Sequence, residues 1–306
     1  SRIRLQYVSG VARSGLASGT AKHPAPEQTL PVHILVSLRH VQMTHGRQAH
    51  RRTVLMPTET SPGQDFRRSS VSESEIAHFS ALAEDWWNPR GPMAPLHAMN
   101  PLRTEWVSRH VAPLRAASAG PLSLLDIGCG AGLASEAYAK LGFETLGIDA
   151  SAAGIRAAEA HLAQHPLPPE AAPLSYRNGS AEDLVAEGAR FDVVNALEVI
   201  EHVNDPQDFL IMLATLTKPG GMVAVSTLNR TPRSFAVAKL GAEYLLRMLP
   251  VGTHDWKKFI KPDELAAMAR QAGLRMLDIA GMSYVPFKWR ESRDTGINYI
   301  AIFRKD

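Results

Sequence analysis

The stretch LLDIGCGAGLASE, residues 124–136, decides the fold of this chain. An apolar run ends in an acid, glycines follow at every second position, and the pattern then becomes helical. A strand, a glycine turn and a helix in this order form the ligand-binding edge of an open α/β sheet. A dinucleotide fingerprint, G-x-G-x-x-G, would place its third glycine at Leu133. The spacing is instead G-x-G-x-G, with Gly128, Gly130 and Gly132, which argues against a dinucleotide.

Two acids accompany the glycine turn. Asp149 ends the next predicted strand, 17 residues after Gly132, where a carboxylate can accept both hydroxyls of a ribose. Asp126 comes immediately before the turn and places an acid near the ligand. That acid suits a cofactor with a cationic group better than a pyrophosphate. The turn therefore predicts a nucleoside cofactor without phosphates.

The rest of the chain alternates between strand and helix patterns, which predicts a doubly wound parallel sheet. Further strands are predicted at 143–149, 174–180, 191–197 and 221–227, with helices at 132–141, 151–164 and 206–217. A helix within 261–273 precedes two closing strands at 274–281 and 297–305. Ahead of the sheet, helical spacing is predicted within 72–87 and again over 102–111.

Composition sets the domain limits and excludes some functions. Residues 1–70 form a basic arm without sustained periodicity, either a transit-like segment or a disordered, mis-started extension. Beyond residue 58 the chain holds 25 basic and 29 acidic residues, because the first 58 hold eight basic residues of 33 and one acid of 30. This mildly acidic balance argues against nucleic-acid binding. The longest apolar run is too short for a transmembrane helix, and the lone Cys129 favours a reducing compartment.

Five segments resemble, in the right order, the motifs of class I S-adenosylmethionine-dependent methyltransferases: LLDIGCGAG, LGIDAS, GSAEDL, FDVVNALEVIEHV and LTKPGGMVAVST. The resemblance implies a Rossmann-like sheet whose last strand is antiparallel, with S-adenosylmethionine as cofactor. It places Gly128 beside the methionine portion, with Gly130 and Gly132 shaping the loop, and Asp149 on the ribose. It also implies that Leu197 flanks the cofactor and that residues 181–183 lie near the adenine.

The flanking segments resemble a narrower family. WWNPRGPMAPLHAMNPLR, the stretch 226–262 and the terminal INYIAIF are similar to ubiquinone-biosynthesis O-methyltransferases, over about 76–303. The resemblance implies both O-methylations of the polyprenylated ring, with Arg103 of NPLR contacting the cofactor. It divides a methyltransferase domain, 71–306, into four parts: a helical cap at 71–115, a cofactor-binding core at 116–230, an insertion at 231–262 and closing elements at 263–306. Methylation of another small phenol and a non-catalytic scaffold remain as alternatives.

The stretch LEVIEHV carries the predicted chemistry. If it forms a helical turn, Glu198, Glu201 and His202 share one face at the carboxyl edge of the sheet. Two carboxylates and an imidazole can hold a divalent ion, which we expect to be Mg²⁺, against adjacent ring oxygens. Alternatively, one acid contacts the cofactor and His202 is a general base. A purely structural role for these residues is the third interpretation.

An amphipathic pattern in the insertion predicts contact with a membrane. Residues 232–249 carry an apolar face flanked by basic residues, which suits a membrane interface or a lid over the active site. A polyprenylated phenol or quinol substrate dissolves in lipid, so the enzyme is expected to be cytoplasmic and peripheral at a bacterial inner membrane. The alternative is the matrix side of the mitochondrial inner membrane. Other ubiquinone-pathway enzymes are candidate partners.

Overall fold

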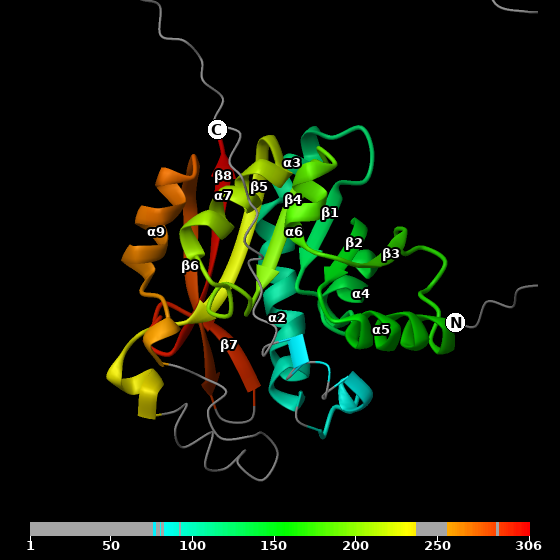
Figure 1. Cartoon of the computed structure of the whole chain (residues 1–306), viewed down its shortest axis with the longest axis horizontal. Helices are drawn as coiled ribbons and strands as arrows, with labels where there is room; N and C mark the ends of the chain where they lie inside the picture. The colour runs from blue at the N-terminus through cyan, green and yellow to red at the C-terminus, as the bar shows by residue number, and fades with distance from the viewer. Residues whose placement is uncertain (1–75, 78–79, 81–82, 92, 237–255, 286–287) are drawn as a thin grey trace, which may run out of the picture. The chain divides into compact units, whose positions relative to one another are not determined.

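The computed structural model (Figure 1) describes residues 76–77, 80, 83–91, 93–236, 256–285 and 288–306. The predicted arm at 1–70, the start of the predicted helix within 72–87 and most of the predicted helix at 232–249 lie outside these residues. No helix within the described ranges is long and apolar enough to cross a membrane.

The described core is one sheet in the order β3-β2-β1-β4-β5-β8-β6-β7. Its strands are β1 (Ser123–Ile127), β2 (Glu144–Asp149), β3 (Leu174–Asn178), β4 (Phe191–Leu197), β5 (Thr217–Leu228), β6 (Leu274–Val285), β7 (Lys288–Ser292) and β8 (Asn298–Lys305). The first five pair in parallel, and β8 runs antiparallel to both β5 and β6. The predicted doubly wound sheet with an antiparallel last strand is confirmed. The strand order reverses between β1 and β4, which is where open α/β sheets bind their ligands.

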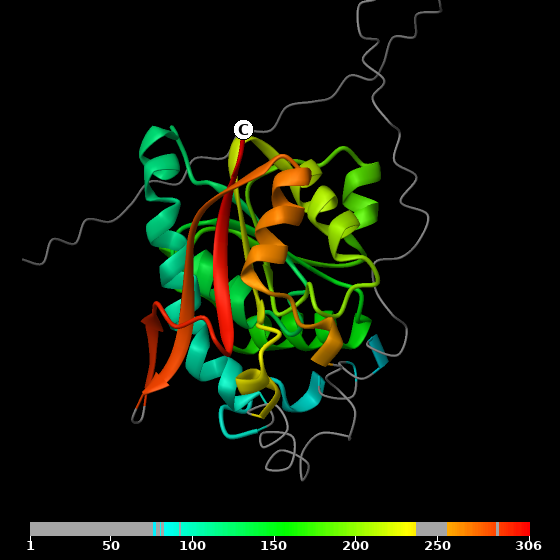
Figure 2. The ribbon, with the colours of Figure 1, turned by 90° about the vertical axis from the view of Figure 1, so that its left-hand side faces the viewer.

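Helices cover both faces of the sheet, and Figure 2 shows α2 and α9 on opposite sides of it. The helices are α2 (Ala94–His110), α3 (Ala112–Ala117), α4 (Leu133–Lys140), α5 (Ala152–Gln164), α6 (Ala181–Ala186), α7 (Pro206–Leu216) and α9 (Pro262–Gln271), with 3-10 turns at Ala83–Asp85 and Trp256–Lys258. One buried cluster joins the sheet to α6, α7 and α9, and a second joins it to α2 and α4. We call these the α7 face and the α2 face.

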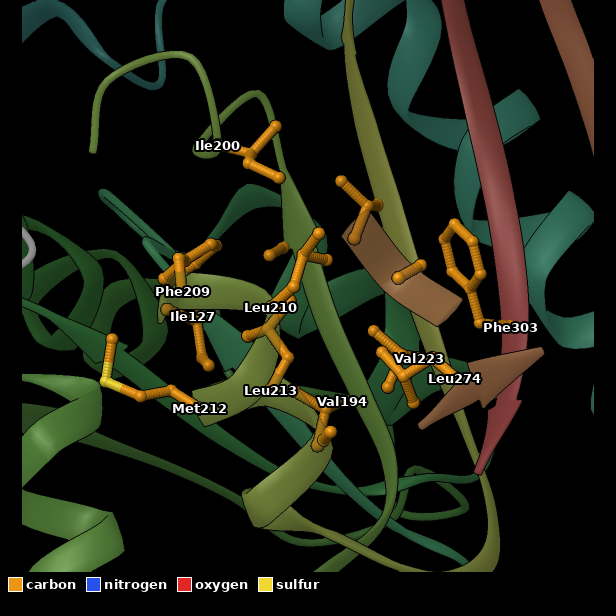
Figure 3. Close-up of a cluster of buried hydrophobic side chains, with 14 of the residues drawn as sticks. Ile127, Val194, Ile200, Phe209, Leu210, Met212, Leu213, Val223, Leu274 and Phe303 are labelled. Atoms are coloured by element: carbon orange, nitrogen blue, oxygen red, sulfur yellow. The ribbon is translucent and has the colours of Figure 1, made fainter. Parts of the chain in front are cut away.

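The α7 face shows why the strands are apolar on successive residues. Phe209, Leu210 and Leu213 of α7 belong to the same cluster as Val194 of β4 and Val223 of β5 (Figure 3). All five side chains are at most 1% exposed, so burying each contributes roughly 1.5–3 kcal/mol to folding. Because the α2 face is buried as well, the parallel strands need apolar residues on both sides.

Several element boundaries differ from the sequence prediction. Helix α2 begins at Ala94, eight residues before the predicted start, and continues through Pro101. A proline inside a helix costs about 3 kcal/mol, and the burial of Met99, Trp106 and Val107 on the α2 face offsets that cost. Strand β5 begins four residues early, and the edge strand β7 and helix α6 were not predicted.

Candidate cofactor and active site

The glycine turn after β1 requires glycine at all three positions. Gly128, Gly130 and Gly132 have φ angles of 69°, 54° and 87°, in the left-handed region where a Cβ is unfavourable. A Cβ on Gly130 would lie 2.3 Å from the Trp86 ring, and one on Gly132 would lie 2.2 Å from the Tyr176 hydroxyl. The missing side chains thus allow Trp86 and Tyr176 to pack directly against the backbone of the turn.

Asp149 connects the glycine turn to the end of β2. Its carboxylate accepts hydrogen bonds from the backbone N–H of Gly130 at 2.8 Å and of Ser151 at 2.7 Å. Burial raises the pKa of Asp149 above its ordinary value, although both hydrogen bonds favour the charged form. The carboxylate therefore lies beside the turn, at the carboxyl end of the strand next to β1, as the predicted ribose site requires. Contact with a ribose stays a prediction.

Asp126 lies deeper than the sequence suggested. Each of its oxygens accepts one hydrogen bond of 2.6 Å, from the Ser135 hydroxyl and from the Asn195 amide. Tyr138 donates to the other end of the Asn195 amide at 3.0 Å, so a buried polar chain underlies the turn on the α2 face. Burial raises the pKa of Asp126 to about 6. Asp126 therefore does not offer an exposed carboxylate, and its proximity to a ligand stays a prediction.

Helix α2 brings Arg103 to the same place. Its side chain is 4% exposed, and its Nη1 lies 3.5 Å from Oε1 of Glu198. The charge of Arg103 also lowers the pKa values of Asp126 and Glu201, although burial outweighs it at both. The guanidinium Nε is buried and has no hydrogen-bond partner among the described residues. An orphaned donor beside the glycine turn fits the predicted cofactor contact, which stays a prediction.

The turn after β4 is not the predicted helical turn, and the prediction that three side chains share one helix face is wrong. Glu198 has a φ of 57°, the one positive value among the described non-glycine residues. Its backbone is bonded to β5, because its N–H donates to the Ser226 carbonyl at 3.0 Å. A hydrogen bond from the His202 N–H to the Val199 carbonyl then closes a short turn. A left-handed non-glycine residue of this kind costs about 1–3 kcal/mol and marks functional sites.

Strand β5 holds the two carboxylates through separate hydroxyls. Ser226 donates to Glu198 at 2.7 Å, and the next residue, Thr227, donates to Glu201 at 3.0 Å. Each carboxylate therefore has its own hydroxyl donor on β5, although the charge of Glu198 still acts on Glu201. Within the described ranges no three His, Cys, Asp or Glu side chains are arranged to hold a metal ion.

Glu201 is a buried acid beside a second carboxylate. Its side chain is 5% exposed, and burial together with the neighbouring Glu198 raises its pKa well above the ordinary value. His202 is half-buried on the same turn, and Leu197 ends β4 in register with Ser226. All three residues lie at the carboxyl edge beside β1, where they were predicted. Their contacts with cofactor and substrate stay predictions.

The N-terminal cap lies over the glycine turn. Trp86 packs against Gly130 and Ala131, and the Trp87 indole N–H donates to the Ala131 carbonyl at 2.9 Å. Trp87 also stacks on His161 of α5, with ring centroids 3.4 Å apart. Trp86 is thus mostly buried against the cofactor loop.

Sequence reasoning missed the polar residues that hold these groups in place: Ser135, Asn195, Ser226 and Thr227. A signal existed for Asn195, which is an amide inside the apolar run FDVVNAL and therefore needs a buried partner. Asp183 belongs to a capping box with Ser180 at the start of α6, so its carboxylate is engaged locally. The predicted adenine contact of 181–183 is untested by this arrangement.

Comparisons with known proteins agree with this fold. A family model described as a methyltransferase domain matches residues 99–279. The solved structure of magnesium protoporphyrin IX methyltransferase from Synechocystis PCC 6803, with bound SAH, has the same fold at 16% identity, with a TM-score of 0.53 over 76% of this chain and 99% of that one. A SAM-dependent methyltransferase from Thermotoga maritima gives a TM-score of 0.50 at 16% identity, over 76% and 99%.

Curated relatives identify a narrower family. The chain is 47% identical to a ubiquinone biosynthesis O-methyltransferase of Cereibacter sphaeroides over 242 residues, which are 76% of this chain and 96% of the relative. It is also 47% identical to the protein of that name from Caulobacter vibrioides, over 78% of this chain and 96% of the relative. The similarity therefore spans almost the whole of each relative. The chain belongs to the ubiquinone biosynthesis O-methyltransferase family.

Proposed function

We propose that this protein transfers a methyl group from S-adenosylmethionine to phenolic oxygens of polyprenylated phenol and catechol intermediates in ubiquinone biosynthesis, at both O-methylation steps. The observation that carries the proposal is the 47% identity to O-methyltransferases of this pathway across 96% of their length. The glycine turn with Asp149 beside it supports the same cofactor independently, since it offers a ribose acceptor and no phosphate fingerprint.

Different residues of this chain contact different parts of the cofactor. Asp149 accepts hydrogen bonds from the ribose hydroxyls, and Leu197 packs beside the cofactor from the end of β4. Gly128 lies beside the methionine portion, and its missing side chain lets Val199 of the turn after β4 pack against the glycine turn. Arg103 supplies a buried positive charge for the cofactor's carboxylate.

The chemistry requires a better nucleophile than a neutral phenol, whose pKa is near 10 by analogy with tyrosine. The phenolic oxygen attacks the sulfonium methyl, so the new C–O bond forms as the C–S bond breaks and neutral S-adenosylhomocysteine leaves. The phenolic proton passes to His202, assisted by Glu201, whose raised pKa makes it a stronger base than an exposed carboxylate. Alignment of oxygen, methyl and sulfur supplies much of the remaining acceleration.

The Mg²⁺ site expected from the sequence does not fit the arrangement described. Glu198 and Glu201 are each held by a different hydroxyl of β5, and no three His, Cys, Asp or Glu side chains of the described residues are arranged to hold a metal ion. A chelating set would need the turn to rearrange, so no step of the reaction is derived through a metal. Chelation by EDTA tests this directly, because it should leave the rate unchanged.

The proposed partner is the polyprenylated substrate at a lipid surface. The segment 232–249, which carries the predicted membrane contact, lies within the described residues only up to 236. Phe235 is 47% exposed there and extends the apolar pattern of that segment. Attachment to the inner membrane and contact with other pathway enzymes are part of the same proposal.

The test is transfer of labelled methyl from S-adenosylmethionine to a demethylubiquinol with a short prenyl tail and to its tail-less counterpart. We expect transfer to both, with a lower KM for the tailed substrate. Glu201→Gln and His202→Gln should still bind S-adenosylhomocysteine and should lose most of their turnover. Full turnover in both variants would remove the proposed base, and equal KM values would favour a small-phenol methyltransferase.

A further inference from the structure

Helix α2 carries a second buried polar side chain on the same face as Arg103. Asn100 lies one helical turn before Arg103 and is 5% exposed. Residues three apart on a helix are neighbours on its surface. Each of the two side chains has one buried atom without a hydrogen-bond partner among the described residues, Oδ1 of Asn100 and Nε of Arg103.

The orientation of the Asn100 amide follows from its one side-chain bond. Its Nδ2 donates to the backbone carbonyl of Leu133 at 2.9 Å. Only the NH₂ end of an amide can donate to a carbonyl, so the acceptor Oδ1 is the end that remains. Leu133 is the first residue of α4 and directly follows Gly132, so the unpartnered acceptor is anchored beside the glycine turn.

A buried acceptor without a partner costs about 1–3 kcal/mol. Native structures keep such groups mainly where a ligand, ion or water completes them. The unpartnered pair on α2 consists of one acceptor and one cationic donor. This combination complements a ligand that carries an ammonium and a carboxylate on the same carbon, which is the α-amino acid group.

We infer that Asn100 is a further cofactor-binding residue, whose Oδ1 accepts a hydrogen bond from the α-ammonium of S-adenosylmethionine while Arg103 pairs with the α-carboxylate. The inference rests on the proposed cofactor. Asp126 is the other acid near the turn, but it is 2% exposed and its carboxylate is bonded to Ser135 of α4 and Asn195 of β4. Asn100 therefore supplies the directional contact, and Asp126 supplies the negative field that favours an ammonium.

The experiment measures the affinity of the purified full chain for three ligands by isothermal titration calorimetry. These are S-adenosylhomocysteine, its analogue without the α-amino group and its analogue without the α-carboxylate. Asn100→Ala should weaken S-adenosylhomocysteine binding about 10- to 100-fold, the range for a hydrogen bond to a charged group. The same substitution should leave the affinity for the analogue without the amino group nearly unchanged.

Two further variants separate binding from folding. Asn100→Asp loses the bond to Leu133 but keeps an acceptor, so it should retain S-adenosylhomocysteine binding. Asn229→Ala is the matched control, because Asn229 is also buried, donates to a backbone carbonyl (Thr295, 2.8 Å) and has an unpartnered Oδ1. It should bind S-adenosylhomocysteine like the unmodified protein.

The inference is overturned if Asn100→Ala weakens S-adenosylhomocysteine and the deaminated analogue equally, since Asn100 would then only position α4. It is also overturned if neither affinity changes. In both cases the unmodified protein still binds S-adenosylhomocysteine, and the proposed function stands. Failure of the unmodified protein to bind S-adenosylhomocysteine at all would instead overturn the cofactor assignment and the role of Asn100 with it.

Discussion

The substitution Asp149→Ala should lower both the stability of the ligand-free protein and its affinity for the cofactor. The carboxylate holds two backbone N–H groups, those of Gly130 at 2.8 Å and Ser151 at 2.7 Å. A hydrogen bond to a charged group contributes about 1.5–3 kcal/mol. Because burial of Asp149 already offsets part of this gain, we expect the free energy of unfolding to fall by about 2–4 kcal/mol.

Asp149→Ala should also weaken cofactor binding directly, in addition to lowering the stability of the fold. Two ribose hydroxyls lose a charged acceptor in Asp149→Ala, so S-adenosylhomocysteine should bind at least about 100-fold more weakly. Asp149→Asn keeps one acceptor oxygen, so its affinity for S-adenosylhomocysteine should lie between those of the unmodified protein and Asp149→Ala. Glu144, which is exposed at the other end of β2, gives the control substitution Glu144→Gln, with no expected effect.

Urea denaturation with and without S-adenosylhomocysteine measures both quantities in one protein. At a ligand concentration 100 times its Kd, the unmodified protein should gain about 2.7 kcal/mol of stability. Asp149→Ala should gain almost nothing at that same concentration. A folded Asp149→Ala protein that gains as much as the unmodified chain would refute the assignment of Asp149 to the ribose.

Three other predictions concern Gly130, the buried Asp126 and the turn after β4. Gly130→Ala should lower the free energy of unfolding, measured in urea, by about 2 kcal/mol or more, since the new Cβ meets the Trp86 ring. Gly188 also has a positive φ, 72°, but a Cβ there would have no atom within 4 Å, so Gly188→Ala should lower the free energy of unfolding less. The pKa of Asp126 is raised to about 6 from 3.8, so its buried charge destabilises the fold above pH 6. The stability of the unmodified protein relative to Asp126→Asn should therefore rise by about 2 kcal/mol as pH falls from 6 to 4 in urea titrations, and a constant difference would contradict this. Thr227→Ala should lower kcat more than S-adenosylhomocysteine affinity, because it removes the hydroxyl that donates to the Glu201 carboxylate; equal losses would point to a general packing defect.

The glycine turn and Asp149 could be predicted because their geometry is local. The glycine spacing and the acid at a strand end indicate this backbone conformation without information from distant residues. The β4 turn could not be predicted in this way, since the left-handed Glu198 depends on Ser226, which is 28 positions away. A periodicity argument applied to LEVIEHV gave a helical turn because it contains no information about β5.

The remaining differences have similar causes. Helix α2 begins before its prolines because Met99 and Trp106 are buried on the α2 face, a tertiary gain that local propensity does not contain. Strand β7 is a short polar edge, KWRES, with no alternating pattern to find. The buried acceptor of Asn100 becomes visible only when the bond to Leu133 fixes its amide.

The central claim is that a methyl group moves from sulfur to a phenolic oxygen on a ubiquinone precursor. The most direct measurement supplies S-adenosylmethionine with a ¹³C-labelled methyl group and a short-tailed demethylubiquinol, and follows the label by NMR. The account predicts an aryl methoxy signal that appears as S-adenosylhomocysteine accumulates, at a rate that EDTA does not change. Label that appears on ring carbon, or cofactor that binds without any transfer, would contradict it.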